Sequence, residues 1–131
     1  MPKIKANQLT RDFFTERGYR IEMVERFNAY SGKRNDLLGC IDYLAMAPGK
    51  KIVGIQSFTS GWSEHERKII KEWPEELIFW LSLKNTSFWF IGWRRLKLKR
   101  GGKAYRVVPR LGKVKLKKGK LILIETARFT K

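Results

Sequence analysis

Residues 39–58, which read GCIDYLAMAPGKKIVGIQSF, decide the fold of this chain. Two largely apolar runs, 39–47 and 52–58, flank the turn sequence PGKK, and this pattern predicts a β-hairpin. An antiparallel register centred on the turn places Asp42 opposite Gln56. Each of these polar side chains interrupts an apolar run, and a buried carboxylate requires a cation or hydrogen-bond donors. The pair therefore predicts either a hard-cation site or a structural hydrogen bond, and the spacing leaves both open.

The segments on either side of the hairpin predict alternating helices and strands. Before it, hydrophobic spacing predicts a helix over 7–17 and a strand over 19–27, followed by a polar loop over 28–35. After it come two helices, an aromatic strand and four short basic strands. These later elements are predicted at 63–72, 74–84, 86–93, 94–99, 105–109, 113–117 and 120–126, with turns at Gly101-Gly102 and Lys118-Gly119.

This order of elements predicts an α/β protein with a mixed central sheet flanked by helices. A chain of 131 residues is the usual size of one domain, so we expect a single domain over 1–131. Within it we expect a core over 1–93 and a basic β meander over 94–131.

The charge of the chain is strongly asymmetric. Lys and Arg total 29 against 12 Asp and Glu, which gives a net charge of +17. Residues 91–131 contain 15 basic side chains and one acidic side chain, whereas residues 1–90 contain 14 and 11. Because the basic residues alternate with apolar strand positions, they indicate an anionic partner, nucleic acid ahead of a membrane surface. The alternative is a basic surface that only keeps the protein in solution.

The candidate phosphate contacts follow this charge. Lysines at every second position predict a basic stripe on one sheet face, and they are Lys97, Lys99, Lys113, Lys115 and Lys117. Arg94 and Arg95 begin the same segment. Lys33 and Arg34 of the polar loop are further candidates, and Thr59 offers a hydroxyl after the hairpin. The structural alternative for Lys33 and Arg34 is an exposed loop, and for Thr59 it is a helix cap.

Composition excludes several kinds of site. The single cysteine, Cys40, excludes an internal disulfide and a zinc site built from thiolates, and we expect it in the core. With one histidine, His65, which we expect at the surface, a metal site must use oxygen ligands. No apolar run reaches the length of a membrane span, and the first residues lack the pattern of a signal peptide. We therefore expect a cytoplasmic protein without a membrane partner.

Short motifs around the hairpin carry a family resemblance. The sequence ERGY at 16–19 ends the first helix, Asp42 lies in the first hairpin strand, and QSF at 56–58 ends the second. Together they resemble the PD-(D/E)XK nuclease superfamily, and within it the archaeal-type Holliday junction resolvases. The segments DLLGCIDYLA, IVGIQSFTSG and FWFIGW also resemble phage and bacterial nuclease-like proteins. The resemblance implies a restriction-endonuclease-like core and a Mg²⁺- or Mn²⁺-dependent endonuclease acting on branched or structured DNA. It leaves open whether the protein forms a homodimer and whether a phage encodes it.

The chain departs from the family's motif at two positions. Gln56 replaces the motif acid and offers an oxygen without negative charge, and Phe58 replaces the motif lysine. The resemblance implies that Asp42 and Gln56 hold the metal ion, which would activate a water molecule and neutralise charge on the phosphate.

An active enzyme would therefore need replacement groups. Glu25 or Asp36 could supply a second carboxylate, and Lys68 could replace the motif lysine. The structural alternatives are a salt bridge for Glu25, a turn residue for Asp36 and a solvated helix face for Lys68. Three functions stay open: a metal-dependent endonuclease, a nuclease-fold protein that binds nucleic acid without cutting it, and an RNA- or ribosome-binding β protein in which the Asp42–Gln56 pair is structural.

Overall fold

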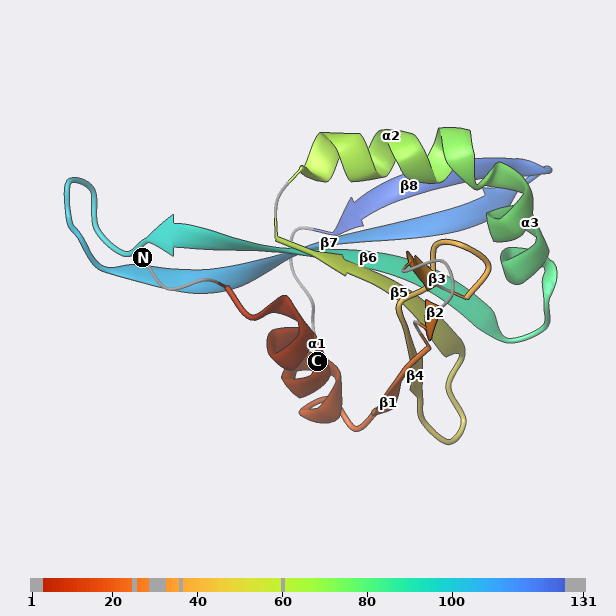
Figure 1. The fold of residues 1–131 in the computed structure, drawn as a ribbon, viewed down its shortest axis with the longest axis horizontal. Helices are drawn as coiled ribbons and strands as arrows, with labels where there is room; N and C mark the ends of the chain where they lie inside the picture. Colours follow the sequence, from red (N-terminus) through yellow and green to blue (C-terminus); the bar gives the residue numbers. More distant parts are fainter. Residues whose placement is uncertain (1–3, 25, 29–32, 36, 60, 127–131) are drawn as a thin grey trace.

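The computed structural model describes residues 4–24, 26–28, 33–35, 37–59 and 61–126. In this part of the chain it shows an α/β fold with a six-stranded mixed sheet, a two-stranded sheet and three helices (Figure 1). The larger sheet has the order β1-β4-β5-β6-β7-β8. Its strands are β1 (Arg20–Met23), β4 (Tyr43–Met46), β5 (Ile52–Phe58), β6 (Thr86–Lys97), β7 (Tyr105–Lys117) and β8 (Lys120–Thr126). The helices are α1 (Ala6–Thr15), α2 (Trp62–Glu72) and α3 (Pro74–Ser82), and the smaller sheet pairs β2 (Arg26–Asn28) with β3 (Lys33–Asn35).

The predicted hairpin forms around its PGKK turn. β4 pairs with β5 in the antiparallel sense, with Leu44 opposite Gly54 as the register predicts. The Lys50 N–H donates to the Ala47 carbonyl at 3.1 Å and closes the turn. β5 then pairs with β6 in parallel. Parallel neighbours need a crossover connection, and here α2 and α3 supply it.

Alternating side chains divide the core between the two faces of the larger sheet. On one face α1 buries Phe14 in a first hydrophobic cluster, and on the other α2 and α3 bury Ile69 and Leu77 in a second cluster. The aromatic side chains of β6 alternate between the two faces. Trp89 and Trp93 join the first cluster, and Phe88 and Phe90 join the second.

The structure corrects the prediction for residues 19–35. The single strand predicted over 19–27 is wrong, because the backbone forms β1 and β2, which belong to different sheets. The predicted loop over 28–35 is wrong at its end, where β3 pairs with β2.

The structure also joins the short strands of the predicted basic meander. β6 continues without a break to Lys97, and β7 runs from Tyr105 to Lys117. Pro109 lies inside β7 at a point where β6 pairs on one side, while in the described residues β8 begins to pair only at Leu111. A proline, which has no N–H, is tolerated in a strand where one side has no ladder to complete.

The ends of β6 and β7 form a two-stranded arm that reaches beyond the helices (Figure 1). We define the basic arm as residues 94–109. Its pairing runs from Arg94 opposite Val108 to Lys97 opposite Tyr105. Four of its apolar side chains are more than one-third exposed, and they are Leu96, Leu98, Tyr105 and Val107. Among the described residues, no helix has the length and apolar character needed to cross a membrane.

Candidate functional site

Asp42 lies at an irregularity just before β4. Its N–H donates to the Ile55 carbonyl of β5 at 2.8 Å, while its own carbonyl accepts from the Val24 N–H at 2.9 Å, on the side of β1. In a regular strand both groups of one residue point to the same neighbour, so the backbone at Asp42 is twisted as in a β-bulge. The predicted register therefore holds as far as Tyr43 opposite Ile55. Beyond that pair, the Asp42 Oδ2 atom accepts the Ser57 N–H at 3.1 Å.

A strained turn holds the chain immediately before Asp42. Leu37 and Ile41 exchange backbone hydrogen bonds of 3.0 and 2.9 Å across it. Leu38 has a φ of 54° and Gly39 a φ of 80°, and a positive φ is uncommon for a residue with a side chain. A Cβ on Gly39 would also lie 3.1 Å from Nε1 of Trp73. Strain of this kind persists only where the surrounding structure enforces it, so the turn fixes the backbone position of Asp42, which follows it directly.

The Gln56 side chain points into the second hydrophobic cluster. Its residue is 6% exposed, and Nε2 donates to the Cys40 carbonyl at 3.3 Å. Its Oε1 is buried and has no hydrogen-bond partner in the described part of the structure. Cys40 is itself fully buried, which confirms its predicted place in the core. Gln56 is therefore a core side chain with one unsatisfied oxygen, which is an energetic cost to the fold.

This geometry does not fit the Mg²⁺ that the resemblance implies. Mg²⁺ keeps several water ligands, and an oxygen in the dry core, such as Oε1 of Gln56, leaves no room for them. One oxygen of Asp42 is engaged by the Ser57 N–H. Within the described residues, no three His, Cys, Asp or Glu side chains come together as a metal site. No metal-dependent step follows from this arrangement.

Of the remaining predicted catalytic residues, Lys68 alone lies in the part of the chain that the structure describes. Lys68 is exposed on α2, and Glu25 and Asp36 lie outside the described residues. Lys68 instead acts on His65, because burial first and the Lys68 charge second lower the pKa of His65, against the opposite effect of Glu64. His65 is half-buried: it stacks on Phe58 with ring centroids 4.0 Å apart, and it also lines an open hollow at the surface.

A network of polar side chains joins α1 to β5 on the sheet face opposite that of Gln56. Thr10 is fully buried, its Oγ1 accepts Nε1 of Trp93 at 2.9 Å, and it shares a 2.8 Å hydrogen bond with Oγ of Ser57. The Tyr43 hydroxyl donates to Oδ1 of Asn7. The sequence analysis missed this network, although Thr10 lies one helical turn before the buried Phe13 and Phe14 and so shares their face of the helix. Ser57 thus connects α1 through its side chain and Asp42 through its N–H.

The basic arm is strongly positively charged. Its seven cationic residues are Arg94, Arg95, Lys97, Lys99, Arg100, Lys103 and Arg106. All are exposed except Arg95, which is half-buried. By the register, Arg95 and Lys97 share one face of the arm, and Arg94 and Arg106 share the other. The sequence has no Asp or Glu from residue 77 to residue 124, so the arm contains no acid to offset this charge.

The structure divides the predicted basic stripe into two groups. Lys97 and Lys99 belong to the basic arm, whereas the other three lysines lie at the far end of β7. Lys97 pairs with Tyr105, and Lys113 follows eight positions later, which corresponds to roughly 27 Å along the strand. Lys115 and Lys117 are exposed, and Nζ of Lys113 lies 4.4 Å from the centroid of the Trp89 ring.

Three further candidate phosphate-binding residues lie away from both groups of lysines. Lys33 and Arg34 are in β3, opposite Asn28 and Phe27 of β2. Thr59 is exposed at the end of β5, where it lines an open hollow of about 560 Å³ together with Asn7 and His65.

No family model, no curated protein and no solved structure matches this chain. The function is therefore inferred from three features of the molecule: the basic arm, the region of Asp42 and the distribution of charge.

Proposed function

We propose that the protein binds nucleic acid, and DNA in particular, through the basic arm. The single observation that carries the proposal is a two-stranded ribbon with seven cations projecting from the body of the protein (Figure 1). The major groove of DNA admits a two-stranded β-ribbon, and Lys and Arg on the ribbon neutralise phosphates along the groove. The exposed Tyr105 and Leu98 add surface against which bases can pack.

The arrangement of charge on the arm favours nucleic acid over a membrane surface. An element that lies on a membrane separates a charged face from an apolar face. Here Arg95 and Lys97 occupy one face and Arg94 and Arg106 the other, so neither face is purely apolar. Exposed apolar residues also occur on both, with Val107 on the first face and Leu96 on the second. Cations on both faces suit a partner whose phosphates flank the arm on both sides.

We further propose that the body is a restriction-endonuclease-like core. The order of elements supports this, because α1, β1, the Asp42 region, the hairpin and β5 follow one another as the resemblance implies. The ERGY sequence at 16–19 turns the chain from α1 into β1, with Gly18 at a φ of 85°. The core also packs α1 and the α2–α3 pair on opposite faces of the sheet.

Binding without cutting is the function that this body supports best. Gln56 is buried and bonded to the Cys40 carbonyl, which leaves Asp42 as the one described carboxylate of the implied metal pair. A metal-dependent endonuclease is the second candidate, because the bulge and the strained turn hold the Asp42 carboxylate in a defined place. That candidate requires a further acid such as Glu25 or Asp36.

Removing four charges from the arm is expected to weaken DNA binding by about two to three orders of magnitude. The arm variant replaces Lys97, Lys99, Lys103 and Arg106 with glutamine. The matched control replaces Arg67, Lys68, Lys71 and Lys84, which are exposed cations on α2 or just after α3, and so removes the same charge. Fluorescence anisotropy with a labelled duplex, at low salt and with a chelator, gives both dissociation constants. The control is expected to weaken binding by no more than about threefold.

Three results would change the proposal. Equal losses in the two variants would show that net charge alone attracts DNA. Tight binding of duplex RNA without binding of DNA would favour the RNA-binding alternative. Plasmid cleavage that requires Mg²⁺ and is lost in Asp42→Asn would place the endonuclease first.

A further inference from the structure

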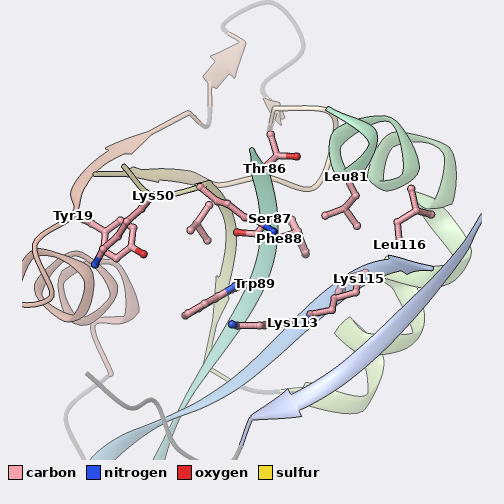
Figure 2. A pocket seen from close by; sticks show the side chains of 13 residues that line it. Tyr19, Lys50, Leu81, Thr86, Ser87, Phe88, Trp89, Lys113, Lys115 and Leu116 are labelled. Atoms are coloured by element: carbon pink, nitrogen blue, oxygen red, sulfur yellow. The ribbon is translucent and has the colours of Figure 1, made fainter. Parts of the chain in front are cut away.

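A pocket opens where β6 and β7 part at the end of the sheet opposite the basic arm. The β6–β7 ladder starts at Phe88 opposite Val114, although β6 begins two residues earlier and β7 continues to Lys117 in its pairing with β8. The strands therefore separate around Ser87 and Lys115. The resulting pocket has a volume of about 510 Å³ (Figure 2). This volume lies in the usual range for small-molecule sites and is much larger than a single phosphate requires.

Four lysines from two parts of the chain line the pocket. Lys50 and Lys51 come from the β4–β5 turn, and Lys113 and Lys115 come from β7. None of the described residues that line it is acidic. Burial, followed by the charges of Lys115 and Lys51, lowers the pKa of Lys113. Lysines placed together without an acid are stabilised by an anion that enters between them.

Two aromatic rings hold lysines at the wall of the pocket. Nζ of Lys113 lies 4.4 Å from the Trp89 ring centroid, and Nζ of Lys50 lies 5.0 Å from that of Tyr19. Figure 2 shows Lys113 beside Trp89 and Lys50 beside Tyr19. A cation over a ring is attracted by its face, so the two contacts fix ammonium groups that would otherwise be free to move into solvent. The pocket thus combines preorganised positive charge with aromatic surface.

We propose that this pocket binds the terminal phosphate of a nucleotide or of a nucleic-acid strand, with Lys51 and Lys113 as its principal contacts. A terminal phosphate carries nearly two negative charges at neutral pH and presents three strong acceptor oxygens, which matches several lysines that line one pocket better than a phosphodiester does. The space beyond the lysines accommodates the attached nucleoside. The site lies at the other end of the sheet from the basic arm, so it does not depend on DNA binding by the arm.

Calorimetric titration of the 131-residue protein tests the site with five probes. They are inorganic phosphate, a nucleoside 5′-monophosphate, the same nucleoside without phosphate, and a short single strand with or without a 5′-phosphate. The monophosphate is expected to bind at least about tenfold more tightly than the nucleoside, which is the value of one charge-assisted contact. Tighter binding of the phosphorylated strand than of free monophosphate would identify a strand end as the source, and the reverse order would identify a free nucleotide.

Matched lysine variants separate the pocket from general attraction to a basic protein. Lys113→Met and Lys51→Met are each expected to weaken monophosphate binding about tenfold or more, whereas Lys117→Met, an exposed lysine on the same strand outside the pocket, should change it less than twofold. The arm variant should leave monophosphate binding unchanged even if it abolishes DNA binding. Equal effects of Lys113→Met and Lys117→Met, or equal binding of nucleoside and monophosphate, would overturn the proposal.

Discussion

The affinity of the protein for duplex DNA is expected to fall by about 10³- to 10⁵-fold between roughly 50 and 200 mM monovalent salt. Each phosphate that a Lys or Arg neutralises releases a condensed counterion, and salt opposes that release. The basic arm presents seven cations, and proteins with six to ten phosphate contacts show a salt dependence of about this size. Anisotropy titrations at several salt concentrations give the slope of log K against log salt.

The slope is expected to become shallower by about 0.9 for each arm cation that contacts a phosphate and is replaced by glutamine. The arm variant removes four cations, so its slope should be about three to four units shallower than that of the unaltered protein. A steep slope that is unchanged in the arm variant would show that other cations bind the phosphates. An affinity that does not respond to salt would remove the electrostatic basis of the proposal.

Phe14→Ala is expected to lower the free energy of unfolding by about 3–5 kcal/mol. Phe14 is fully buried, and its ring packs against Phe13, Tyr19 and Trp89 with centroid distances of 5.2, 5.7 and 5.9 Å. The truncation leaves a cavity where α1 meets the sheet, and the lost energy is a large share of the stability of about 5–15 kcal/mol that is usual for a domain. Urea unfolding followed by circular dichroism measures the change.

Phe79→Ala is the matched control for this substitution. Phe79 lies on α3 and is 58% exposed, so its truncation is expected to change the unfolding free energy by no more than about 0.5 kcal/mol. Similar losses in the two variants would contradict the burial of Phe14 between α1 and the sheet. At temperatures where Phe14→Ala stays folded, its DNA affinity should match that of the unaltered protein, because the arm is outside the first cluster.

The hairpin was predictable because its signals are local. Two apolar runs on either side of PGKK fix both the strands and the register, and the observed pairing of Leu44 with Gly54 follows from them. The bulge at Asp42 was not predictable, because it depends on a turn in which Leu38 takes a positive φ. Leucine rarely adopts a positive φ, and the residues beside Leu38 in the sequence do not predict one. The regular register therefore placed Asp42 opposite Gln56, whereas its carboxylate bonds to the Ser57 backbone.

The positions of the basic residues were only partly predictable for a similar reason. Period-two spacing correctly assigns lysines to one strand face, but it does not show how far two strands stay paired. β6 leaves β7 before Lys115, and both strands extend together past Arg94. These two facts create the pocket and the basic arm at opposite ends of one sheet. Lys50 and Lys51, which the sequence indicates only as turn residues, become pocket residues because the hairpin brings them next to β7.

Amide NMR of the ¹⁵N-labelled protein, titrated with duplex DNA in the presence of a chelator, tests the central claim most directly. The basic arm is the surface proposed to contact DNA, so the largest chemical-shift changes are expected at residues 94–109. The amides of α3, from Glu75 to Ser82, should change little, because α3 covers the sheet away from the arm. Shift changes concentrated around Asp42 and α1, with the arm unaffected, would contradict the account.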